Sequence, residues 1–314
     1  MVLNQYEFLV NPPQERWDEM VEIIYADRKW KLSTFDYASF REGHGEENYK
    51  FIVAIDKATN KAVGSISGAN FPSVDGSPQV FVIGMYYSLP QLRSNGLGRK
   101  MFDLVMEYAE GNVFLNSAPE MAKKYAERSG FDKIAPWDLV ALSFDAKDCD
   151  LTRITADTTI RIVDFEEVDF EKLDEYDRKI GGNVHRRGFM KKFLTQPEAY
   201  NKFAIDSCGN LLGYCNARIV YGNNVVLEPF YAANPSIAKT LLKCTLEQVP
   251  DLHSRQQLVT YIASDNAEGM ALFKQLSGGE LNVDKVIPRQ FTKEIIDTDS
   301  EQVYSIAEAH TTHV

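Results

Sequence analysis

Residues 93–102, with the sequence RSNGLGRKMF, place two glycines among cations directly before an apolar run. Glycine inside a helix costs roughly 0.5–1 kcal/mol relative to alanine, so Gly96 and Gly98 need another reason to stand there. A helix N-terminus offers unpaired amides and a positive dipole end, and glycine lets an anion approach that backbone without a Cβ in the way. The spacing therefore predicts an anion-binding loop to which Arg93, Arg99 and Lys100 add positive charge.

Two other phosphate-binding motifs fail here on single residues. A P-loop requires GxxxxGK[ST], whereas Arg99 follows Gly98, and a dinucleotide fingerprint requires a third glycine where Met101 stands. The pattern that fits is [Q/R]-x-x-G-x-[G/A], filled by Arg93, Gly96 and Gly98.

The elements that position this loop follow from apolar periodicity and turn residues. In the first half we expect strands at residues 6–10, 50–56, 62–71, 79–88, 112–116 and 137–145, and helices at 12–30, from the loop to 110, and at 118–130. In the second half we expect strands at 159–165, 202–206, 211–221, 223–232, 256–264 and 289–295, and helices at 171–180, 186–195, 234–249 and 266–279. The matching order predicts a duplicated fold, with a boundary at about residues 147–157 and a frayed polar tail from 297 onward.

Composition narrows the class of protein. A length of 314 residues is typical of two domains, and the net charge of −11 argues against nucleic acid as a main partner while favouring a cationic substrate. The four cysteines form no CxxC pair and no metal-ligand spacing, so we expect reduced thiols and no metal site: Cys149, Cys208, Cys215 and Cys244. Without a signal segment or an apolar run of membrane-spanning length, the sequence predicts a cytoplasmic protein with no membrane partner.

The loop and its flanks resemble the GNAT superfamily of acetyl-CoA-dependent N-acetyltransferases. The stretch YYSLPQLRSNGLG matches that family's strand and loop position for position, with Pro90 three residues before Arg93, and the segments NVFLN and GF follow it. The resemblance implies an α+β fold of two GNAT-like domains, each a mixed, mostly antiparallel twisted sheet flanked by helices. Residues 1–148 would form an N-acetyltransferase domain, residues 157–296 a degenerate GNAT-like domain, and residues 297–314 a flexible tail.

The same resemblance implies acetyl-CoA as cosubstrate and a set of residues that hold it. The loop would wrap the pyrophosphate with its main-chain amides, and the strand before it would splay from its neighbour and pair with the pantetheine arm. Asn116 matches a family asparagine that bonds this arm, although a helix cap or Asx turn explains it equally well. The implied cofactor-binding residues are Tyr86, Tyr87, Ser88, Arg93, Ser94, Asn95, Gly96, Leu97, Gly98, Arg99 and Asn116.

The second half also resembles a GNAT domain but lacks the loop. Its segment YAANPSIAK has neither glycine nor arginine ahead of the helix, and Pro235 removes an amide that a phosphate needs. We expect no coenzyme A there. Asp177, Arg186 and Arg187 would either line a pocket between the halves or form a surface charge cluster.

Catalytic groups are harder to find. The family tyrosine that protonates the leaving thiolate falls at Ala126, and Tyr125 stands one residue early, so it is either a packing residue or a proton donor whose register an extra residue near Ser129 restores. We expect His44, Glu46 and Glu47 in a loop that either borders the acceptor site or is simply solvated.

The resemblance predicts an N-acetyltransferase that passes an acetyl group to a small-molecule or peptide amine by direct attack. The acidic composition favours polyamines, lysines or amino sugars as acceptors. The alternatives are a sensor or scaffold protein that binds coenzyme A without turnover, or an interaction module that binds no cofactor. We expect a monomer or homodimer, and we read His310 and His313 as ordinary tail residues.

Overall fold

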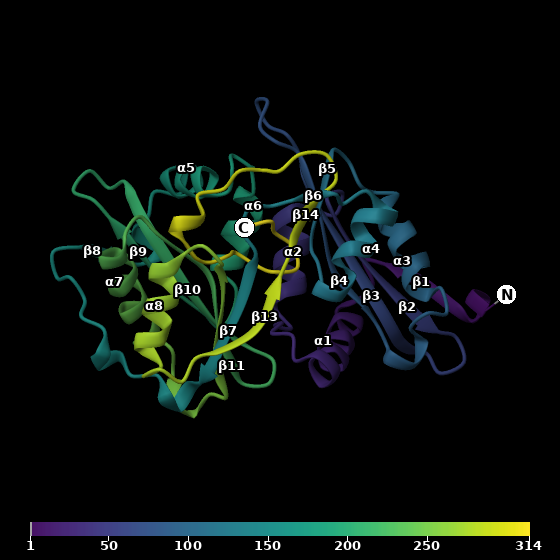
Figure 1. Cartoon of the computed structure of the whole chain (residues 1–314), viewed down its shortest axis with the longest axis horizontal. Helices are drawn as coiled ribbons and strands as arrows, with labels where there is room; N and C mark the ends of the chain where they lie inside the picture. The colour runs from purple at the N-terminus through teal and green to yellow at the C-terminus, as the bar shows by residue number, and fades with distance from the viewer. Residues whose placement is uncertain (1) are drawn as a thin grey trace.

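The computed structural model describes residues 2–314, which fold around two β-sheets set side by side (Figure 1). The first sheet has the strand order β1 (Tyr6–Val10), β2 (Tyr49–Asp56), β3 (Lys61–Phe71), β4 (Val80–Ser88), β5 (Asn112–Asn116), β14 (Arg289–Phe291), β6 (Lys133–Ile134). The second has the order β13 (Asn282–Ile287), β7 (Leu139–Asp145), β12 (Gln257–Ala263), β11 (Asn224–Ala232), β10 (Leu211–Val220), β9 (Ala199–Ile205), β8 (Arg161–Val163), with β15 (Val303–Ser305) paired on β11. The pairs β4–β5 and β11–β12 are parallel among antiparallel ones, which confirms the predicted mixed, mostly antiparallel sheets.

Helices follow the same order in both halves. They are α1 (Gln14–Arg28), α2 (Asp36–His44), α3 (Leu97–Met106) and α4 (Pro119–Ser129), then α5 (Phe170–Ile180), α6 (Arg187–Leu194), α7 (Pro235–Leu246) and α8 (Ala267–Leu276). Short 3-10 turns lie at Val2–Gln5, Pro90–Leu92, Ala146–Asp148, Leu151–Arg153, Phe165–Glu167, Leu252–Ser254 and Ser300–Gln302.

Alternation along the strands divides the core into layers. On β2, Phe51 and Val53 face the core shared by α1, α2, α5 and α6, whereas Ile52 and Ala54 pack with α3. The core on the α1 side runs without interruption into the second half, while α7 and α8 belong to a separate core there. The two halves are therefore joined by a common hydrophobic layer.

The helices α2 and α6 cross at a pair of glycines in this layer. A Cβ on Gly43 would lie 2.6 Å from the Cα of Phe189, and one on Gly188 would lie 2.4 Å from the carbonyl oxygen of Gly43. Any side chain at either position would force the helix backbones apart. The helix α2 was not expected, and it places His44 at its last residue among Phe71 and Phe189 rather than in a loop beside the site. Of the three residues expected in that loop, Glu46 and Glu47 lie beyond the helix.

The two halves exchange one strand each. β7, expected to complete the first domain, instead pairs with β12 and β13 in the second sheet, with Leu139 opposite Ala263. β14, expected to complete the second, pairs with β5 and β6 in the first, with Arg289 opposite Asn116. Apart from this exchange the strand orders match, so the two halves are copies of one topology. The expectation that residues 137–145 belong to the first sheet was wrong, because an apolar strand pattern specifies burial on both faces and not the neighbouring strand.

Residues 303–314, which we call the closing segment, return to the middle of the molecule (Figure 1). After β15 the chain is buried apart from the partly exposed Ala309 and His310, and Val314 is 0% exposed. Buried Arg186 donates to the main-chain oxygen of Val314, buried Arg289 donates to that of His313, and the His313 ring bonds the carbonyl of Gly181 at 2.9 Å. The prediction of a flexible tail was wrong: the polar groups that suggested solvation are bonded inside the protein.

A buried ion network ties α2 to the second sheet. The Arg218 guanidinium on β10 binds Asp36 at the start of α2 and, at 2.7 Å, Glu228 on β11. Gln196 donates to Asp36 at 3.3 Å and accepts from Ser39 at 2.9 Å. Buried charges persist when they are paired and bonded in this way.

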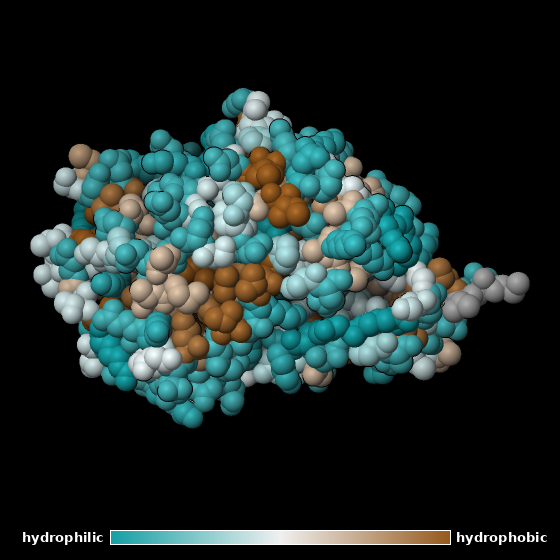
Figure 2. All heavy atoms as spheres, in the orientation of Figure 1, coloured by the Kyte–Doolittle hydropathy of each residue, from teal (hydrophilic) through white to brown (hydrophobic). Residues whose placement is uncertain are grey.

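The strand β13 forms the outer edge of the second sheet. Its Val283 and Val286 side chains are exposed, and Figure 2 shows apolar side chains gathered over this region within a largely hydrophilic face. The same strand carries residues toward the interior on its other side, as described below.

The closing segment leads to a pH-dependent stability. Burial lowers the pKa of the His313 imidazole to about 3, helped by the charge of Arg186, whereas an unfolded histidine titrates near ~6.5. Between these values the unfolded state binds more protons, so this histidine lowers stability progressively as pH falls from about 6.5. We expect His313→Gln, which keeps an amide donor toward Gly181, to flatten the dependence of the urea midpoint on pH between 7.5 and 5.

The matched control is His253→Gln, which changes an exposed histidine. Equal slopes for wild type and His313→Gln, with a changed slope for His253→Gln, would contradict the buried placement of His313.

Candidate functional site

The strands β4 and β5 run parallel for a short distance and then diverge. Residues 80–83 pair with residues 112–115, and from Gly84 onward β4 has no partner on β5. At the same point Met85 adopts a left-handed backbone with φ of 49°, and the register with β3 shifts between Ser65 and Ser67. This bulge turns the end of β4 away and opens a wedge between the two strands.

The predicted anion loop connects β4 to α3. Gly96 caps the helix with a φ of 92°, which favours glycine, and a Cβ there would meet nothing within 4 Å. The Asn95 side chain accepts from the amide of Leu97 at 3.0 Å. Within residues 2–314 no protein group accepts from the amides of Gly98 and Arg99. The start of α3 thus presents free N–H groups beside an open left-handed glycine, the arrangement that suits a phosphate.

The arginines of the loop do not extend this cradle. Arg93 binds Asp27 of α1 at 2.9 Å and the Ser88 carbonyl at 3.3 Å, and Arg99 pairs with Asp103 at 2.8 Å. Their charges are compensated, so the anion site of the first half depends on main-chain amides more than the sequence suggested.

The two tyrosines of β4 point to opposite faces. Tyr87 is 4% exposed and packs in the shared core, whereas Tyr86 lies toward α3, with its hydroxyl 2.8 Å from where a Cβ on Gly98 would be. Tyr86 contacts Phe102, whose ring stacks with Tyr125 of α4 at 6.1 Å. Tyr86 and Tyr125 therefore share one aromatic layer, and Tyr87 does not belong to it.

The last turn of α4 sets the direction of Tyr125. Gly130 ends the helix with a φ of 76°, and its amide donates to the Tyr125 carbonyl five residues back. This hydrogen bond spans five residues, one more than the four that a regular α-helical hydrogen bond spans. Tyr125 lines the cavity described next, and burial raises the pKa of its hydroxyl well above the usual value.

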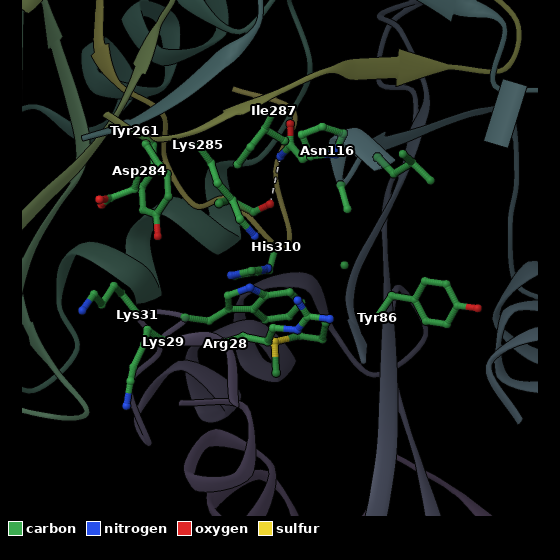
Figure 3. Close-up of a pocket in the computed structure, with 18 of the residues that line it drawn as sticks. Arg28, Lys29, Lys31, Tyr86, Asn116, Tyr261, Asp284, Lys285, Ile287 and His310 are labelled. Atoms are coloured by element: carbon green, nitrogen blue, oxygen red, sulfur yellow. Dashed lines mark hydrogen bonds between the residues drawn. The ribbon is translucent and has the colours of Figure 1, made fainter. Parts of the chain in front are cut away.

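A cavity of about 410 Å³ extends from the wedge to the second half (Figure 3). It is lined by Arg28 at the end of α1 and Lys29, Trp30 and Lys31 after it, by residues 83–86 and 115–116, by Ala118, Pro119 and Tyr125 of the α4 region, by Ala141, Gln257, Val259, Tyr261, Asp284, Lys285 and Ile287 of the second sheet, and by Ala309 and His310. Of the predicted site residues, Tyr86, Asn116 and Tyr125 line it. Its walls therefore come from both halves of the chain.

The closing segment forms one wall of this cavity at the wedge. Asn116 donates to the Ala309 carbonyl at 2.9 Å, and helix α4 is capped by Ala118, so Asn116 is not its N-cap. The His310 carbonyl would lie 1.6 Å from a Cβ on Gly84, so only glycine fits at that position. The side-chain oxygen of Asn116 is buried and has no hydrogen-bond partner among residues 2–314, and a ligand in the wedge would satisfy it.

His310, which we read as an ordinary tail residue, belongs to this site. Its ring packs on Trp30 with 4.7 Å between centroids and lines the cavity. Burial lowers its pKa to about 4, with a contribution from the charge of Arg218, so the imidazole is neutral near pH 7. The polar composition of the last residues suggested a solvated tail, and only the folded structure places His310 at the wedge.

The second half closes the equivalent wedge with its own chain. β11 and β12 pair over residues 225–227 and 258–260, and beyond that β15 lies on β11, with Phe230 opposite Ser305. The start of α7 is also occupied, because the Asn234 side chain accepts from the Ile237 amide at 3.0 Å and Pro235 has no N–H.

Of the three residues expected either in a pocket between the halves or in a surface charge cluster, Asp177 and Arg186 form a buried ion pair, and Arg187 lies on the surface. Arg186 binds Asp177 at 2.7 and 2.9 Å with both side chains buried, and Tyr214 donates to Asp177. Arg187 binds Glu171 on the surface.

Comparison with known proteins agrees with this geometry. The sequence profile described as the Acetyltransferase (GNAT) family matches residues 17–131, and the one described as the Acetyltransferase (GNAT) domain matches residues 173–305. The chain is a tandem GNAT protein. No curated protein matches the sequence.

Several solved structures share the fold of the whole tandem GNAT chain. A protein from Pyrococcus horikoshii assigned as an acetyltransferase has a TM-score of 0.68 at 13% identity, covering 98% of this chain and 96% of that one. A tandem GNAT protein from the clavulanic acid biosynthesis pathway has a TM-score of 0.62 at 16% identity, with 91% and 98% covered. A GCN5-related N-acetyltransferase from Sphaerobacter thermophilus has a TM-score of 0.56 at 14% identity, with 97% and 98% covered. Family and fold together support an acyltransferase. No helix within residues 2–314 has the length and apolar character to cross a membrane.

The contact between Gly98 and Tyr86 can be tested by a double-mutant cycle. Alanine favours a helix over glycine by roughly 0.5–1 kcal/mol, but in the wild type its Cβ meets the Tyr86 hydroxyl. We expect Gly98→Ala to stabilise the protein more in a Tyr86→Phe background than in the wild type, by about 0.5 kcal/mol or more in urea unfolding. The same effect in both backgrounds would show that the hydroxyl does not lie over the helix start.

Proposed function

We propose that the first half binds acetyl-CoA and transfers its acetyl group to an amine that enters the cavity. The observation that carries the proposal is the difference between the two wedges. In the first half the cavity opens into the wedge, and free amides at the start of α3 lie beside it. In the second half β15 fills the equivalent wedge. The pairing of β15 with β11 supports this proposal, because it places an extended, hydrogen-bonding chain in a gap of the same kind.

The residues present suit the two ends of this cosubstrate. The amides of Gly98 and Arg99 would bind the pyrophosphate at the start of α3, with Lys100 nearby. The main chain of β4 from Gly84 to Ser88 would pair with the pantetheine arm, and the buried side-chain oxygen of Asn116 would accept from one of its amides.

Acetyl-CoA supplies an acyl thioester; the amine nitrogen forms a bond to its carbonyl carbon as the carbon–sulfur bond breaks. Two protons must then move, one onto the departing sulfur and one off the amine nitrogen. Tyr125, kept protonated by burial, would donate the first. His310, neutral near pH 7 and lining the same cavity, would accept the second through its ring nitrogen.

Binding is tested by calorimetric titration with acetyl-CoA. We expect Gly96→Val combined with Gly98→Val to weaken binding by about 10²-fold, because side chains there block amides that contribute about 1.5–3 kcal/mol each to a charged ligand. The control is Gly279→Val, since Gly279 has a φ of 98° and, like Gly96, open space around it. Absence of binding by the intact protein, or equal losses for the control, would refute the site.

Turnover is tested by thiol release from acetyl-CoA across a panel of amines. We expect Tyr125→Phe and His310→Phe each to lower kcat by about 10²-fold or more with acetyl-CoA affinity nearly unchanged, because each removes a proton carrier and leaves an aromatic ring in its place. Exposed Tyr108→Phe is the control.

A panel without turnover, despite tight binding, would favour a non-catalytic coenzyme A sensor. Ala126 favours this alternative, because it stands where the family has the tyrosine that protonates the leaving thiolate.

A further inference from the structure

The charge of the cavity wall is opposite to that of the protein. The chain as a whole has 34 lysines and arginines against 45 acidic residues, a net charge of −11. Among the charged side chains that line the cavity, Asp284 is the acidic one, and the basic ones are Arg28, Lys29, Lys31 and Lys285. An acidic protein thus gathers positive charge around one cavity, with Lys31 buried in it and Arg28, Lys29 and Lys285 exposed at its mouth.

These cations differ in how far the protein already satisfies them. Lys31 is committed to Asn224 at 3.0 Å and Gln257 at 3.1 Å, and the ammonium of Lys29 lies over the Tyr25 ring.

Arg28 and Lys285 are the cations left for a ligand. Arg28 contacts Asp27 at 3.2 Å, but that carboxylate also binds Arg93 at 2.9 Å. Lys285 has no ion pair or side-chain hydrogen bond within residues 2–314. Positive charge from one residue of each half therefore lacks full compensation.

Figure 3 shows how these two side chains lie. Lys285 reaches from β13 toward His310, and Arg28 lies on the opposite side of His310, at the end of α1. The residues that would hold the cosubstrate phosphates begin α3 and do not line the cavity, so Arg28 and Lys285 are not needed there. They lie beside the wedge and remain open to the second substrate of the proposed reaction.

We propose that the acceptor is a small amine that also carries an anionic group, a carboxylate or a phosphate ester, as in an amino acid or an aminoalkyl phosphate. The inference rests on the proposed function. The anion would bind the Lys285 ammonium on one side of His310, with the charge of Arg28 on the other side adding attraction, and the amine would face His310 and the end of β4. A guanidinium binds either anion through paired N–H donors, and a polyamine is repelled by the same charges. This proposal replaces the cationic acceptors that the acidic composition favoured. The net charge of −11 describes the whole protein, whereas the charged side chains that line this cavity are mostly basic.

Matched acceptor pairs separate the effect of the anion from that of the amine. Thiol release from acetyl-CoA is measured with amino acids and their carboxamides, with O-phosphoethanolamine and ethanolamine, and with spermidine. We expect the anionic member of one pair to have a kcat/KM at least 10-fold above its neutral partner, and the pair that shows this identifies carboxylate or phosphate. In Lys285→Ala this ratio should fall about 10-fold, whereas exposed Lys274→Ala should leave it unchanged.

The outcomes distinguish the two proposals. Turnover that favours neutral amines or spermidine overturns the anionic acceptor and leaves the acetyltransferase intact. If no amine releases thiol, the proposed transfer fails, and calorimetric titration with the same pairs decides the inference. Binding of the anionic member alone, weakened in Lys285→Ala, would support it, and equal binding of both members would overturn it.

Discussion

Arg289 stacks on Trp137 at the junction of the two halves, where each half gives one strand to the other. The guanidinium lies 3.4 Å from the ring centroid, with both residues buried, and the two side chains stand at the starts of the exchanged strands, Arg289 opening β14 and Trp137 two residues before β7. Arg289 also donates to the main chain of His313, so the same side chain fixes the closing segment. Because neither sheet is complete without a strand from the other half, the cavity between them has walls whose separation is set by backbone pairing. On β14, Gln290 donates to the carbonyls of Ala122 and Phe131, so the helix that carries Tyr125 is itself anchored by the second half.

Duplication produced two wedges, and the chain uses them differently. In both, a parallel strand pair diverges toward the loop that leads to a helix, and the register with the neighbouring antiparallel strand shifts at that point. In the second half β15 supplies the missing hydrogen bonds, and a proline and an asparagine close the helix start. In the first half the chain enters the wedge only with Ala309 and His310, which touch Asn116 and Gly84 without forming a strand. Backbone N–H and C=O groups on an unpaired strand edge inside a protein need hydrogen-bond partners. Here the unpaired edge of β4 lies beside the free amides at the start of α3.

The sequence carries local signals well and long-range ones poorly. The glycine loop was predictable because a left-handed cap and a free helix start impose residue types within six positions, and the structure places Gly96 and Gly98 as that pattern implies. The exchange of β7 and β14 was not, since neither the apolar pattern of β7 nor the three residues Arg289–Phe291 of β14 specify which strand lies beside them. The closing segment was misjudged for a related reason: its threonines and histidines read as solvated, although Glu308 accepts from the His310 amide and the Thr311 hydroxyl, each at 2.8 Å. Compensation of this kind is invisible until the chain is folded.

That carboxyl group shows how the interface and the site depend on each other. Glu308, Glu228 and Asp36 interact electrostatically with the single guanidinium of Arg218, an excess of acid that a buried site does not tolerate in fully ionised form. Burial and the charge of Asp36 raise the pKa of Glu308 to about 7, and burial raises that of Glu228 well above its usual value. A protonated carboxyl here relieves the repulsion while still accepting from the turn that holds His310. The charge balance at the junction of α2, β10 and β11 is therefore part of what keeps the His310 wall of the cavity in place, although none of these carboxyl groups lines it.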